Sequence, residues 1–165
     1  MEPRPKILPE LTALDKFVEA ICLSLLLLLW AFSIFAYVQL PEIIPIHFNA
    51  SGKPDGYGSK MTLFLLPLIS SALYLGLTSI NRYPHIFNYT VKITEANAAQ
   101  QYKLATRVLR FTKLAVVLIF SAIVFSTFQS GRGKSDGLGS WFFPMIIAFS
   151  VAGAVVPILL AARKS

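Results

Sequence analysis

Four long apolar runs restrict what this sequence can fold into more than any other feature. They cover residues 17–38, 61–80, 111–128 and 141–162, and each contains at most one charged residue. A helix needs about 20 predominantly apolar residues to cross the hydrocarbon core of a bilayer. The sequence therefore predicts an all-α integral membrane protein, with four transmembrane helices in a single membrane domain over residues 1–165.

The distribution of charge supports this topology and argues against a nucleic-acid partner. Only 14% of the residues are charged, against about 25% in an average soluble domain. Most lysine and arginine residues, which give the chain its net charge of +7, lie in the N-terminal, central and C-terminal segments. The basic residues of the two remaining loops are Lys53, Lys60, Arg132 and Lys134. By the positive-inside rule, both termini lie in the cytoplasm and these two loops face the opposite side of the membrane.

The third apolar run is the end of a longer predicted helix. Thr94 is a good N-cap, Glu95 favours a helix start, and no helix breaker follows before residue 128. A helix that begins near residue 95 would be roughly 50 Å long. It would project beyond the membrane, where Lys103, Arg107 and Arg110 would meet either anionic lipid headgroups or water.

A short polar motif occurs twice, each time just before an apolar run. Residues 52–59 read GKPDGYGS and residues 133–140 read GKSDGLGS, so the copies differ only at Pro54 against Ser135 and at Tyr57 against Leu138. Since an apolar run precedes and follows each copy, the sequence predicts that a unit of helix, loop and helix is duplicated. Two such hairpins, related as parallel repeats by an axis along the membrane normal, would place both loops side by side.

Residues shared by the two loops are assigned mainly to structure. Asp55 and Asp136 occupy equivalent positions, and they either converge on a small acidic site for a cation or an amine, or each close their own turn by accepting backbone N–H groups. Glycines permit tight turns, with a positive φ expected at Gly56, and serines cap the helices that follow. The structural assignments are Pro45, Gly52, Gly56, Ser59, Gly137 and Ser140.

The first loop alone carries the stretch IPIHFN, residues 44–49, where the second copy reads FSTFQS. Its IIPIHF part predicts a short extended segment. His47, Phe48 and Asn49 are therefore candidate residues for binding a ligand or partner, together with the two aspartates. An exposed histidine at this place would either respond to pH or order the loop through hydrogen bonds.

The sequence LPEIIPIHFNASGKPDGYGSK, with an apolar run on each side, resembles the signature of a bacterial membrane-protein family of unknown function, whose loop follows the pattern IPxHFNxxGxPDGxGSK. The same unit resembles the N-terminal part of SdpI-type immunity proteins, and the resemblance covers about residues 14–120. It implies a multi-pass protein of the bacterial cytoplasmic (inner) membrane. SdpI itself gives immunity to a secreted peptide toxin, so the resemblance implies a role of that kind.

Three functional hypotheses follow. The first is a non-enzymatic protein whose extracytoplasmic loops bind a peptide or protein, in toxin immunity or sensing. The second is a scaffold or accessory subunit that packs against a larger membrane complex, for which small residues such as Ala72 and Gly76 are suited. The third is a surface enzyme that uses His47 and Asp55.

The sequence lacks the patterns expected of most other classes of membrane protein. None of the apolar runs carries a charge in its middle, which ion-coupled transporters require. The motifs of zinc proteases, serine hydrolases and phosphate-binding loops are missing. Cys22 is the lone cysteine and is expected to be a small buried residue. Neither a cofactor nor a metal is predicted, and membrane lipid is the one partner that the composition requires.

Overall fold

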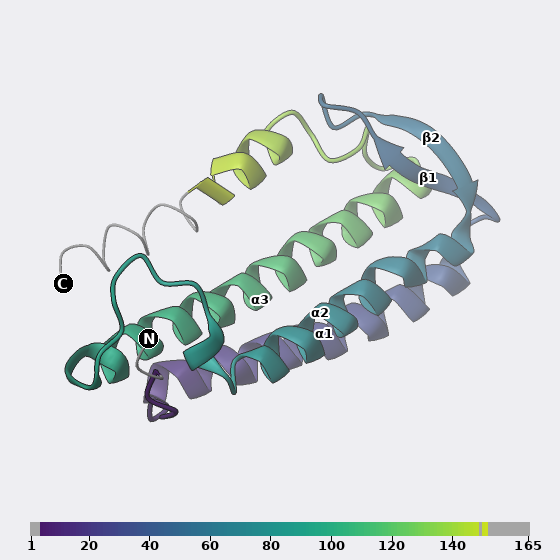
Figure 1. The fold of residues 1–165 in the computed structure, drawn as a ribbon. Helices are drawn as coiled ribbons and strands as arrows, with labels where there is room; N and C mark the ends of the chain where they lie inside the picture. The colour runs from purple at the N-terminus through teal and green to yellow at the C-terminus, as the bar shows by residue number, and fades with distance from the viewer. Residues whose placement is uncertain (1–3, 149, 152–165) are drawn as a thin grey trace.

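The computed structural model describes residues 4–148 and 150–151 and is mostly helical (Figure 1). Three long helices lie side by side: α1 (Ala13–Gln39), α2 (Leu65–Ile80) and α3 (Glu95–Gly131). With the 3₁₀ turn Lys60–Phe64 that precedes α2, all three are long and apolar enough to cross a membrane. Three of the predicted membrane helices, and the start of the third near residue 95, are thereby confirmed.

The fourth predicted span is described only at its beginning. Residues 142–148 are helical and pack against α3, where Phe142 and Phe143 lie beside Ile119 and Ile123. The remainder of the 141–162 run, apart from residues 150 and 151, lies outside the described residues. The count of four spans and the pair of duplicated hairpins therefore stay predictions.

A small antiparallel sheet joins α1 to α2 and corrects the all-α expectation. Strand β1 (Ile43–Phe48) pairs with β2 (Pro54–Ser59), which confirms the extended segment predicted from IIPIHF. All residues of β1 except His47 are apolar, and Ile44 and Phe48 are buried whereas Ile43 and Ile46 remain exposed. We call the end of the helical bundle that carries this sheet the hairpin end.

The tight turn lies earlier than predicted. Gly56 was expected to adopt a positive φ, but it lies within β2 opposite His47, where a Cβ atom would come 3.0 Å from the Cβ of His47. Within this first loop, the glycine that has a positive φ is Gly52, at 75°. The prediction failed because it used only the preference of proline and glycine for turns. The position of this turn is determined by Asn49, whose side chain accepts hydrogen bonds from Ser51 and Lys53.

Side chains at the helix starts explain why the helices begin where they do. Thr12 caps α1 and forms a reciprocal capping box with Asp15. Thr94 caps α3, as predicted, and its N–H donates to the Asn97 side chain at 2.9 Å. The predicted cap at Ser59 is also confirmed, since its hydroxyl accepts a hydrogen bond from the Met61 N–H at 3.3 Å.

The core contains two apolar layers along the bundle, and two further clusters lie around Phe142 and around Tyr102. The layer at the hairpin end joins α1, α3, β1 and the 3₁₀ turn, and the other joins α1 to α3 near the opposite end. The first contains Leu29, Ala36, Leu40, Ile44, Leu63, Val124 and Phe128, and the second contains Cys22, Leu26 and Val117. The expectation of a buried Cys22 is confirmed.

Ser33 provides a first test of this packing. Its hydroxyl is fully buried and has no hydrogen-bond partner among the described residues. A buried unpaired hydroxyl costs about 1–3 kcal/mol, so Ser33→Ala is expected to raise the free energy of unfolding by about 1 kcal/mol. Unfolding by dodecyl sulfate in mixed micelles measures this quantity.

Ser71→Ala is the matched control, and it should be destabilising, because Ser71 Oγ donates to the Pro67 carbonyl at 2.8 Å and accepts from Trp30 Nε1 at 2.9 Å. Equal losses in both variants would contradict the prediction.

Candidate functional site

The hairpin pairs two of the predicted site residues with each other. The Nδ1 atom of His47 on β1 lies 2.5 Å from Oδ1 of Asp55 on β2. Both side chains remain open to solvent, with 72% and 42% of their surface exposed. Asp55 therefore has a partner within its own loop, and His47 forms a contact within the loop of the kind that one of its two hypotheses expected.

Asn49 is a structural residue of the turn between the strands. Its side-chain Oδ1 accepts hydrogen bonds from the N–H groups of Ser51 and Lys53, at 2.9 and 3.1 Å. Its own N–H donates to the Lys53 carbonyl at 2.9 Å. Asparagine commonly closes turns in this way, so the side-chain oxygen of Asn49 is already used within the loop.

The two glycine-rich loops lie in direct contact, as the repeat predicted. The N–H of Leu138 donates to the carbonyl of Gly52 at 2.8 Å. A Cβ atom on Gly52 would come 2.4 Å from the Gly139 oxygen, and one on Gly137 would come 2.1 Å from the Gly52 oxygen. Both close approaches therefore require glycine. The copies nevertheless differ in conformation, since residues 54–59 form a strand whereas residues 135–140 form turns.

Asp136 does not repeat the contacts of Asp55. It is exposed and lines a polar cavity of about 530 Å³ together with Lys53, Tyr57, Ser130 and Ser135. Within the described part of the chain, no three acidic, histidine or cysteine side chains come together as a metal site would need. Ser140 lies just before the helical segment 142–148, and its hydroxyl bonds to no described residue.

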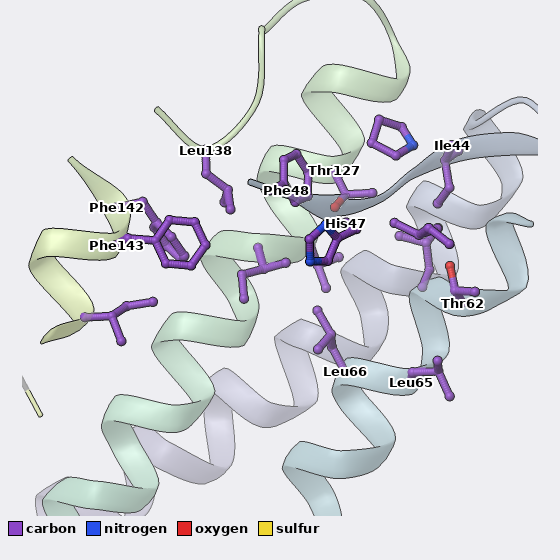
Figure 2. A pocket seen from close by; sticks show the side chains of 16 residues that line it. Ile44, His47, Phe48, Thr62, Leu65, Leu66, Thr127, Leu138, Phe142 and Phe143 are labelled. Atoms are coloured by element: carbon purple, nitrogen blue, oxygen red, sulfur yellow. The ribbon is translucent and has the colours of Figure 1, made fainter. Parts of the chain in front are cut away.

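An apolar cavity of about 440 Å³ lies beneath the hairpin (Figure 2). Phe48 is buried against Leu138 and Phe142, and these three residues form one wall. Figure 2 shows Leu65 and Leu66 of α2 across the cavity from Phe142 and Phe143. The other walls come from β1, the start of α2 and the end of α3, through residues that include Ile44, His47, Leu63, Ile123 and Thr127.

Comparison with known proteins places this hairpin in a recognised domain. Residues 24–70 match a domain of unknown function, DUF1648. The match covers most of α1, the whole hairpin and the first part of α2. An uncharacterized protein of Archaeoglobus fulgidus is 40% identical over 86 residues, which are 47% of each chain. The chain thus aligns with about half the length of the curated relative it matches. No solved structure matches it.

A buried ionic cluster, entirely outside the DUF1648 match, joins α1 and α3 at the other end of the bundle, which we call the ionic end. Arg107 binds Asp15 through two hydrogen bonds, from Nε at 2.9 Å and from Nη2 at 3.1 Å. Lys113 Nζ donates to both carboxylate oxygens of Glu19, at 2.9 and 2.7 Å. Arg110 Nε lies 3.2 Å from Glu19 Oε1. This cluster comprises two acids and three bases.

The centre of the cluster is shielded from solvent, whereas the side chains of Arg107 and Glu19 remain 30% and 26% exposed. The Asp15 side chain is 3% exposed and that of Lys113 is fully buried. Lys113 also donates to the Thr78 hydroxyl of α2 at 2.8 Å and lies 4.7 Å from the centre of the Tyr74 ring. The single ammonium group of Lys113 therefore contacts all three long helices.

Sequence reasoning missed this cluster. Arg107 and Arg110 were expected to meet lipid headgroups or water, and contacts between both of them and the acids of α1 were not foreseen. The signal was present in the spacing. Asp15 and Glu19 are four residues apart and Arg107, Arg110 and Lys113 recur every third residue, so each set lies along one face of its helix.

The exposed pair of His47 and Asp55 and the turn residue Asn49 are expected to contribute differently to the free energy of unfolding. His47→Ala is expected to change the free energy of unfolding by less than about 1 kcal/mol, because exposed ion pairs contribute little. Asn49→Ala should lower it by about 1–3 kcal/mol, since the Ser51 and Lys53 N–H groups lose their acceptor. Chemical unfolding of the two purified variants in the same detergent compares them. A larger loss for His47→Ala would show that the pair, and not the turn, fixes the hairpin.

Proposed function

We propose that this chain is a non-enzymatic, multi-pass membrane protein whose hairpin end binds a peptide or protein, in toxin immunity or sensing. The proposed topology has four spans arranged as two parallel-repeat hairpins, with both termini in the cytoplasm of a bacterial cell and the hairpin end outside. The distribution of lysine and arginine supports this orientation. The direct contact between the two glycine-rich loops supports the arrangement of the hairpins.

The observation that carries the proposal is the apolar cavity beneath the hairpin. Ligand sites in proteins are commonly apolar concavities of about 300–1,000 Å³ with a few polar groups at the edge. This cavity holds about 440 Å³, which suits one or two large apolar side chains of a peptide. The paired His47 and Asp55 are exposed beside it and offer polar contacts.

The surface around the cavity is suited to a peptide backbone and its side chains. Ile43, Tyr57 and Trp141 are each more than 60% exposed near the hairpin. Two-stranded sheets also leave strand edges whose N–H and carbonyl groups can pair with an extended peptide. These features favour a partner with an extended backbone and apolar side chains, such as a secreted peptide toxin of the kind that the SdpI resemblance implies.

A protection assay tests the proposal. The chain is expressed in a sensitive bacterial host that is exposed to a panel of secreted bacterial peptide toxins, and survival is measured. Protection against at least one peptide is expected. Leu66→Trp, which fills the cavity from α2, should abolish that protection. Leu68→Trp is the matched control, because this leucine lies on the same helix and is 57% exposed.

The amount of each variant in the membrane is measured by immunoblot, so that loss of protection is compared at equal abundance. No protection by the natural chain across the panel would overturn the proposal. Equal protection by Leu66→Trp and Leu68→Trp would exclude the cavity as the binding site. His47→Ala is added to the same assay, since a surface enzyme that uses His47 would lose all activity in this variant.

The alternative function, a scaffold or accessory subunit, is favoured by one feature of α2. Gly76 and Ala72 lie one turn apart and are exposed, and a Cβ atom on Gly76 would meet no described residue within 4 Å. Small residues at this spacing let a second helix approach closely in a membrane. Gentle purification should then recover a stoichiometric membrane partner, and Gly76→Leu should release it. Recovery of the chain alone would argue against this function.

A further inference from the structure

The ionic cluster has a surplus of positive charge that its own residues do not neutralise. Its members are Asp15, Glu19, Arg107, Arg110 and Lys113, so two carboxylates face three cations. Charges that are removed from water need partners, because an unpaired buried charge is costly. The cluster would therefore gain from one more negative charge.

Arg110 is the cation that lacks a full set of partners. Arg107 and Lys113 each form at least two hydrogen bonds to the acids of α1. No hydrogen bond with Arg110 as side-chain donor occurs among the described residues, although its side chain is only 10% exposed. Its contacts are Nε to Glu19 at 3.2 Å, in a direction that makes no hydrogen bond, and Nη1 to Asp15 at 4.0 Å.

The position of Arg110 along the bundle corresponds to a membrane surface. Glu19 and Lys113 lie about 20 residues from the hairpin ends of α1 and α3, and Thr78 lies about as far from Lys60, where the 3₁₀ turn before α2 begins, which matches the thickness of a hydrocarbon core. Large apolar side chains beside the cluster are exposed, among them Leu14, Phe17 and Phe111. In a bilayer these side chains face lipid, so the headgroups of that leaflet lie at the level of the guanidinium group.

We propose that Arg110 binds a phosphate group and thereby completes the ionic cluster. A phosphodiester carries one negative charge, which matches the surplus of one cation. Guanidinium groups bind phosphate oxygens through two parallel N–H donors, and those of Arg110 are not used within the described chain. An anionic phospholipid such as phosphatidylglycerol supplies this group at the correct depth, and free phosphate has the same chemistry. This proposal does not depend on peptide binding at the hairpin end.

Lipid titration of the purified full-length chain tests the proposal. Phosphatidylglycerol, phosphatidylcholine or inorganic phosphate is added to the delipidated protein in dodecyl maltoside, and bound lipid is counted by native mass spectrometry. Binding of one phosphatidylglycerol, with at least about tenfold preference over phosphatidylcholine, is expected from a charge-assisted contact. Arg110→Gln should weaken this binding about tenfold, whereas Lys103→Gln, an exposed position on the same helix, should leave it within about twofold.

Arg110→Lys keeps the charge if Arg110→Gln fails to fold, and it should bind phosphatidylglycerol more weakly than the natural chain because it lacks the planar pair of donors. Thermal stabilisation by inorganic phosphate alone, with displacement of the lipid, would support the anion site and identify free phosphate as its ligand. Equal binding of the two lipids by the natural chain would overturn the proposal. Equal losses in Arg110→Gln and Lys103→Gln would also overturn it.

Discussion

Replacement of Lys113 by methionine is expected to lower the free energy of unfolding by about 3 kcal/mol, because it removes a fully buried cation from its ion pair with Glu19. The ammonium group of Lys113 is fully buried and donates three hydrogen bonds, two to Glu19 and one to Thr78. Methionine fills a similar volume but provides no donor. Both the carboxylate and the hydroxyl would lose a partner, and Glu19 would keep its contact with Arg110, whose Nε lies 3.2 Å from Glu19 Oε1.

The matched control is Lys103→Met, since Lys103 lies on the same helix and is exposed. This variant should change the stability by less than about 0.5 kcal/mol. Unfolding by dodecyl sulfate in mixed micelles measures both variants. The double variant Lys113→Met with Glu19→Gln removes both charges, and it should be more stable than Lys113→Met alone. A loss below 1 kcal/mol in Lys113→Met would show that the cluster contributes little to the packing of the three helices.

The second large effect is expected at Gly52, where a substitution would separate the two glycine-rich loops. Gly52 has a φ of 75°, and a Cβ atom would come 2.4 Å from the Gly139 oxygen. Gly52→Ala therefore adds backbone strain to a collision with another backbone segment. Together these are expected to lower the free energy of unfolding by about 2–4 kcal/mol.

Gly133 is a control supplied by the repeat itself. It occupies the equivalent position in the second copy and has a similar φ of 68°, but a Cβ atom there would lie more than 4 Å from the other residues that the structure describes. Gly133→Ala should therefore cost about 1–2 kcal/mol, from backbone strain alone. Chemical unfolding of the two variants gives the difference, which measures the contact between the loops. Equal losses would mean that the loops do not support each other.

The sequence was sufficient to locate the membrane helices because hydrophobic runs and caps act locally. The apolar run at 61–80 and the cap residue Ser59 predicted the second helix directly, and both were found. The glycine-rich repeat also predicted that the two loops meet, and the hydrogen bond from Leu138 to Gly52 provides that contact.

Features that depend on pairing between distant segments were not predictable in the same way. Strand β2 forms because Pro54 to Ser59 lies opposite β1, although its glycines favour turns when they are read alone. Asp55 has His47 as its partner because of the strand register. The sequence had left two other roles open for Asp55, a shared acidic site with Asp136 and closure of its own turn. The ionic cluster needs the relative rotation of α1 and α3, which periodicity within each helix leaves open.

The ionic cluster also bears on the order in which the chain is made. The acids of α1 and the bases of α3 are separated by more than 90 positions in sequence. During synthesis, α1 is therefore complete before Arg107 and Lys113 exist, so Asp15 and Glu19 lack these cations as partners until α3 is made. Once α3 has been made, α1 can pack against it through the ion pairs of Asp15 and Glu19. The segment of residues 24–70, which matches DUF1648, consequently depends on a later segment of the chain to reach its final position.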